Sequence, residues 1–127
     1  MPHGYDYAVI RVVPRVEREE FVNVGVILSC PSRDFLDARL HLDHARLVAL
    51  DPQLDLELVE QHLRAIPLVC RGDASAGTIA ALPVRQRFHW LVAPRSTIIQ
   101  TSVVHSGLCE DPSGALAHLM QRMVLSP

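Results

Sequence analysis

Residues 21–30 read FVNVGVILSC, and this stretch decides the fold because its polarity alternates with a period of two. Alternate side chains of a β-strand point to opposite faces of the sheet, so a strand with one apolar face packs that face on a core. The apolar residues occupy every even position: Val22, Val24, Val26, Leu28 and Cys30. We expect a strand that packs Val24, Val26 and Leu28 against helices, while Asn23 and Gly25 face the other way.

Two neighbouring segments extend this strand into a sheet. Residues 5–13 are rich in aromatic and β-branched side chains and apolar on both faces, which is typical of a strand inside a sheet. Residues 35–42 alternate in the same way as residues 21–30. The connecting segments are short, so the three strands should be neighbours in an antiparallel meander. Residues 97–104 return to strand character and predict a fourth strand.

Helices are expected between and after these strands. Asp43, Asp55 and Asp111 each precede a helical pattern, where a carboxylate can cap the first turn. Pro67 should end or kink the second helix, and residues 83–91 form a further helix-like segment. The fold class is therefore α+β, with an antiparallel sheet of three to four strands and helices packed on one face. Residues 1–127 form a single domain by length.

Composition excludes some classes of protein. The net charge is −2 and aromatic residues make up 5% of the chain, which argues against a nucleic-acid-binding protein. The amino terminus lacks the pattern of a signal peptide, and no apolar run is long enough to span a bilayer. We expect a cytoplasmic protein, no membrane association, and free thiols at Cys30, Cys70 and Cys109.

The first candidate binding residues lie on and before residues 21–30. Arg15, Glu20 and Asn23 combine an arginine-rich connector with a polar strand face, and guanidinium groups bind carboxylates or phosphates. The alternative is a solvated hairpin with weak surface ion pairs. Gly25 within the strand indicates a bulge or the close approach of another group.

The second group contains Arg87, Trp90, Arg95 and Ser96. Arg87 and Trp90 are three residues apart and can share a helix face, while Arg95 and Ser96 follow in a loop. A tryptophan flanked by arginines is a frequent interface anchor. The alternative places Trp90 in the core with the arginines stacked on it from outside.

The third candidate is His105, which precedes Cys109 by four residues. The two could ligate zinc or form a nucleophile–base pair. However, no further cysteine or histidine stands at a ligand spacing, and no orienting third group can be located. The alternative is a buried thiol and a hydrogen-bonded histidine near a turn. We therefore predict neither a metal site nor a cofactor.

Three segments carry a family resemblance: YAVIRVVP at residues 7–14 with EEFVNVGVIL at 19–28, APRSTIIQ at 93–100, and HSGLC at 105–109. In this order they resemble the bacterial family known as domain of unknown function 3037, and the resemblance runs nearly end to end. It implies no established activity. It does imply an association with kinase-like proteins similar to the HipA toxins, of which a small domain could be a partner, regulator or antitoxin.

Three functional hypotheses follow. The favoured one is a small, non-enzymatic interaction or regulatory module, with a HipA-like kinase as a candidate partner. The alternative is a small enzyme or nucleotide-binding protein that uses a polar cluster of Asn23, Arg95 and His105. Nucleic-acid binding is the third. The sequence contains no glycine-rich phosphate loop and no motif of a known hydrolase or zinc peptidase.

Overall fold

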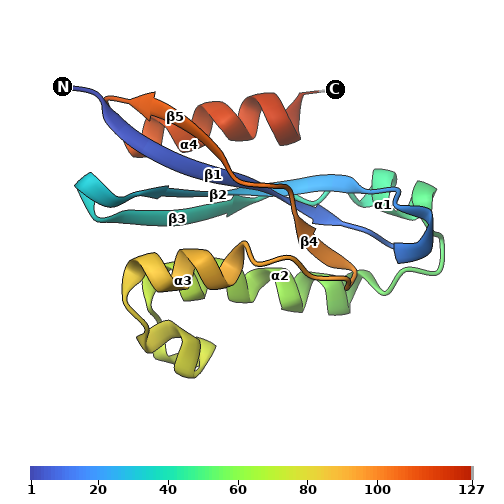
Figure 1. The fold of residues 1–127 in the computed structure, drawn as a ribbon. Coiled ribbons are helices and arrows are strands. Elements are labelled where there is room, and N and C mark those ends of the chain that lie inside the picture. Colours follow the sequence, from blue (N-terminus) through green and yellow to red (C-terminus); the bar gives the residue numbers. More distant parts are fainter. Residues whose placement is uncertain (127) are drawn as a thin grey trace.

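The computed structural model describes residues 1–126 as one antiparallel sheet with helices on both faces (Figure 1). The strands are β1 His3–Val12, β2 Val22–Cys30, β3 Phe35–Leu40, β4 Ile99–Thr101 and β5 His105–Cys109. The α-helices are α1 His44–Leu50, α2 Leu56–Arg71, α3 Val84–Leu91 and α4 Pro112–Met120. A π-helical turn, Gln121–Leu125, follows α4. The α+β prediction is confirmed.

The predicted meander is present, since β1 pairs with β2 and β2 pairs with β3. The order across the sheet is β3-β2-β1, and both β4 and β5 pair with the remaining edge of β1. The segment predicted as the fourth strand, residues 97–104, contains β4, and β5 follows it as a further strand that was not predicted. β5 pairs with the first half of β1 and β4 with the second half.

Two apolar cores lie on opposite faces of the sheet. Leu47 of α1, Leu63 of α2 and Phe88 of α3 pack in the first core, on what we call the α2–α3 face. Leu116 and Met120 of α4 pack in the second, on the α4 face. Figure 1 shows α4 on one side of the sheet and α2 with α3 on the other. Helices therefore cover both faces, rather than the one face that was predicted.

A β-bulge in β2 explains why the second core was missed. Ile10 of β1 lies opposite Gly25 and Arg11 lies opposite Asn23, so Val24 between them has no partner residue on β1. Val24 consequently packs on the α2–α3 face, whereas Val26 and Leu28 pack on the α4 face. The prediction that these three side chains share one face is wrong, because an extra residue shifts the alternation by one.

Gly25 allows this bulge. A Cβ atom on Gly25 would lie 2.5 Å from the backbone oxygen of Arg39 and 2.8 Å from a methyl group of Leu40, both on β3. No side chain fits in that space, so the close approach expected for a glycine within a strand is confirmed.

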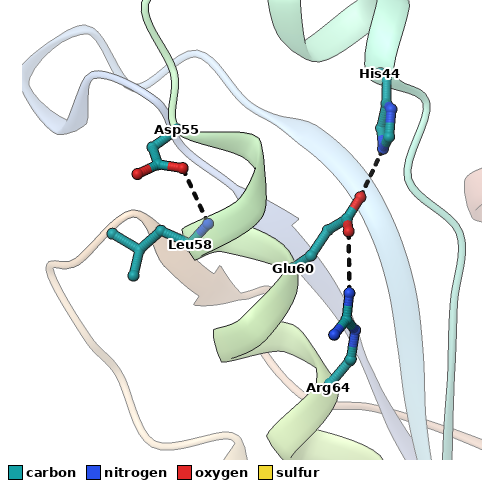
Figure 2. Close-up of polar contacts among 5 residues, drawn as sticks. All are labelled: His44, Asp55, Leu58, Glu60 and Arg64. Atoms are coloured by element: carbon teal, nitrogen blue, oxygen red, sulfur yellow. Dashed lines mark hydrogen bonds and ion pairs between the residues drawn. The ribbon is translucent and has the colours of Figure 1, made fainter.

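The predicted helix caps are present. Asp43 accepts a hydrogen bond from the backbone N–H of Arg46, and Asp111 accepts two at the start of α4. Asp55 accepts one from Leu58 at 3.1 Å, as Figure 2 shows. These bonds satisfy donors that the first turn of a helix leaves without a partner.

A bridge between helices orients α2. The carboxylate of Glu60 lies 2.7 Å from the ring nitrogen Nε2 of His44 on α1 and accepts a bond from Arg64 one turn later (Figure 2). Pro67 does not end α2, which continues to Arg71. The turn beyond the proline buries Val69 and Cys70 in the core, and this packing outweighs the lost backbone bond.

Candidate functional site

The predicted residues of the connector between β1 and β2 form separate exposed contacts. Arg15 lies 3.9 Å from the carboxylate of Asp51, and Glu20 pairs with Arg18. The hydrogen bond from Arg18 lowers the pKa of the Glu20 carboxylate. The structure does not bring Arg15 and Glu20 into one anion site.

Asn23 has a structural partner on the α4 face. Its amide nitrogen donates to the backbone oxygen of Met123 at 3.1 Å and so ties β2 to the π-helical turn. Its amide oxygen is buried without a partner among the described residues, as is Nε of Arg11, its neighbour on β1. The guanidinium of Arg11 lies over the ring of Phe21, 4.1 Å from its centroid.

Arg87 contacts the end of α2. Its guanidinium donates to the backbone oxygens of Val69 at 2.9 Å and Cys70 at 2.7 Å, and to Leu82 at 3.0 Å. Carbonyl groups at the carboxyl end of a helix lack intrahelical donors, and a cation there also stabilises the helix dipole. These bonds fix α3 against α2, so Arg87 has a structural role.

Trp90 and Arg95 do come together. The Arg95 guanidinium lies 4.7 Å from the centroid of the Trp90 ring and donates to the backbone oxygens of Trp90, Leu91 and Ala93. Trp90 is 42% exposed, so it is not a core residue, although an arginine does stack on it. Ser96 is exposed in the loop that follows.

This pair borders a cavity of about 480 Å³ between α2, the end of α3 and β4. We call it the Trp90 cavity. Its lining is mainly apolar and includes Ile66, Leu91 and Ile99, with Gln61 and Thr97 among its polar groups. Ligand pockets in proteins have this size and this mixture of an apolar lining with a few polar groups.

His105 begins β5 and stacks on Tyr7 of β1, with 5.4 Å between ring centroids. On β1, the residue opposite His105 is Tyr7 and the residue opposite Asn23 is Arg11, and these two are four positions apart, which corresponds to about 13 Å. Arg95 lies beyond the other face of the sheet, at the end of α3. The structure therefore does not place Asn23, Arg95 and His105 in one cluster.

The spacing of His105 and Cys109 on an extended strand also separates these two residues by about 13 Å. They cannot form a nucleophile–base pair or bind one zinc ion. Burial, the largest cause, raises the pKa of the Cys109 thiol, so less of the reactive thiolate forms at neutral pH. Within residues 1–126, no group of three or more potential metal ligands comes together.

A polar network between β1, β5 and α3 was not predicted. Arg85 donates to Asp6 at 2.7 Å and to the buried Ser29 at 3.1 Å, and Ser106 donates to the other oxygen of Asp6 at 2.7 Å. The bond from Ser106, followed by that from Arg85, lowers the pKa of Asp6. The network ties α3 and β5 to β1. Its members come from β1, β2, α3 and β5, which are distant in the sequence, so no local sequence signal could reveal it.

The exposed edge of the sheet was also missed. β5 is hydrogen-bonded only to β1 among the described strands, so its outer side carries backbone groups without a strand partner. Leu108 of β5 is 72% exposed, and Val103, two residues before β5, is 75% exposed. We call residues 103–108 the β5 edge. Its residues include no aspartate, glutamate, lysine, arginine or proline, which are common protections of sheet edges.

The fold defines the class as a small α+β protein, an antiparallel sheet covered by helices on both faces. The family model described as "Protein of unknown function (DUF3037)" matches residues 7–124, and the chain belongs to this family. No curated protein and no solved structure matches the chain. In the described part of the chain, no helix has the length and apolar character that crossing a membrane requires.

Proposed function

We propose that this chain is a small cytoplasmic interaction module that binds a partner protein by accepting a strand of that partner along the β5 edge. The observation that supports the proposal is the exposure of Leu108 on the edge strand β5, and of Val103 two residues before it, without charged protection. An added strand would satisfy the outward backbone groups of β5 and cover these two side chains. A sheet edge with unpaired backbone groups is a template for pairing with a strand of another chain.

The first partner to test is a HipA-like kinase, since the family resemblance implies an association with such kinases. The test measures the affinity of the purified chain for the HipA-like kinase of its own host by calorimetry. Leu108→Lys should weaken binding at least tenfold, because it puts a charge where an apolar contact is expected. Val48→Lys is the matched control, as Val48 is 41% exposed but lies on α1.

Hydrogen exchange tests the strand addition directly. Backbone amides within residues 105–109 that point away from β1 should exchange more slowly in the complex, because they gain hydrogen bonds to the partner. A kinase that does not bind the wild-type chain would reject this partner. Binding that survives Leu108→Lys, with unchanged exchange in β5, would reject the edge as the docking site.

A further inference from the structure

We propose that the Trp90 cavity binds a small amphipathic monocarboxylate, with the apolar body inside the cavity and the carboxylate at Arg95. This site is separate from the β5 edge and needs no partner protein. Its volume of about 480 Å³ lies within the range of small-molecule pockets.

The lining determines the chemistry of the ligand. Ile66 and Val69 of α2, Leu91 of α3 and Ile99 of β4 provide apolar walls, and the indole of Trp90 forms a further apolar border. When an apolar ligand body enters this space, its own surface and that of the cavity walls are removed from water. This burial stabilises the complex by about 25 cal/mol per Å² of apolar area. A purely polar ligand would gain nothing from these walls.

The charge of the lining determines the head group. Arg95 and His62 border the cavity, and none of the described lining residues is an aspartate or glutamate. Arg95 uses three donor contacts on backbone oxygens, and a guanidinium has more N–H groups than these contacts require. The remaining N–H groups have no partner among residues 1–126. They favour an anionic acceptor such as a carboxylate over a cation.

The polar border is held in place before a ligand arrives. The hydroxyl of Thr97 donates to the backbone oxygen of Ile99 at 3.0 Å, and the Gln100 amide donates to that of Thr97 at 2.8 Å. Arg95 is fixed both by its backbone contacts and by the Trp90 ring. A site whose groups are already ordered loses little entropy on binding.

Trp90 also supplies the measurement, because the chain has one tryptophan and it borders the cavity. Octanoate, kept below the concentration at which it forms micelles, is titrated into the isolated chain while Trp90 emission is recorded. We expect a saturable change. Octylamine has the same chain length with a cationic head, and it should bind at least tenfold more weakly.

Variants separate the two parts of the proposal. Ala65→Leu fills the cavity from the exposed side of α2 and should weaken octanoate binding, whereas Ala117→Leu on α4 should leave it unchanged. Arg95→Gln should weaken octanoate binding about tenfold through the lost charge-assisted bond. Because Arg95 also contacts the end of α3, Gln61→Glu provides a second charge test that leaves those contacts intact. It should lower affinity for octanoate and raise it for octylamine.

The absence of a saturable response to octanoate would overturn the site. Equal affinities for octanoate and octylamine, or a Gln61→Glu variant that changes neither, would overturn the carboxylate assignment. An unchanged affinity in Ala65→Leu would show that the ligand binds outside the cavity. None of these results depends on a protein partner, so failure here is distinguishable from failure of the interaction proposal.

Discussion

The substitution Gly25→Ala tests the feature on which the sheet depends. The added methyl group would lie 2.5 Å from the backbone oxygen of Arg39, which cannot move without disturbing the pairing of β2 with β3. Overpacking of this kind costs about 3 kcal/mol. Gly25 does not have a positive φ, so alanine also restricts the unfolded chain and returns about 0.5–1 kcal/mol. The net loss should be about 2 kcal/mol.

Urea denaturation followed by circular dichroism measures this loss, which corresponds to a fall in Tm of about 6–10 °C at this chain length. Gly4→Ala is the matched control, because Gly4 also lies in a strand without a positive φ and an added Cβ would meet nothing within 4 Å. It should leave stability unchanged or slightly raised. If the Gly25→Ala variant were as stable as the wild type, the inference that the backbones of β2 and β3 approach closely at Gly25 would be refuted.

Three further outcomes are expected from denaturation experiments. Arg87→Leu should lower the unfolding free energy by about 3 kcal/mol, because it removes the donor to three backbone oxygens, whereas Arg122→Leu, at an exposed position, should change it by less than about 0.5 kcal/mol. Burial raises the pKa of the Cys70 thiol from 9.0 to about 12, so this thiol ionises at a lower pH in the unfolded chain than in the folded one. The free energy of unfolding should therefore fall as the pH rises through this interval, and Cys70→Ala should reduce that fall. Asp6→Asn should cost about 1 kcal/mol at neutral pH, and since the folded pKa of Asp6 is lowered, its difference from wild type should shrink as the pH falls below about 4.

The sequence predicts strands and helix starts well because their signals are local. Alternating polarity marks β2 and β3, and a carboxylate before each of α1, α2 and α4 marks the first turn. The bulge is not local in this sense. Gly25 indicated a close approach, but which residue the register would skip depends on how β1 and β3 pair with β2. Without that register, the α4 face could not be distinguished from the α2–α3 face.

The candidate site was predictable only where its members are close in the chain. Trp90 and Arg95 are five residues apart and meet at the end of α3, so the pattern of a tryptophan near arginines identified a real contact. Arg87 carries the same local signal but binds the end of α2, which is distant in sequence. Asn23 and His105 were grouped with Arg95 because each is a polar residue in a segment that carries the family resemblance, and neither property carries information about distance across a sheet.

The β5 edge and the Trp90 cavity adjoin each other at the break between β4 and β5. Ser102, which is buried, accepts a hydrogen bond from the backbone N–H of Val9 through its hydroxyl and donates its own N–H to the Val9 backbone oxygen. Its hydroxyl also bonds the backbone oxygen of Val103. With these contacts the chain leaves the regular ladder at Ser102, so Val103 projects into solvent before β5 begins. On the other side of the break, β4 is a short strand against β1 that also lines the cavity with α2. Ser102 therefore lies between the two surfaces: Thr101 before it lines the Trp90 cavity, and Val103 after it begins the β5 edge.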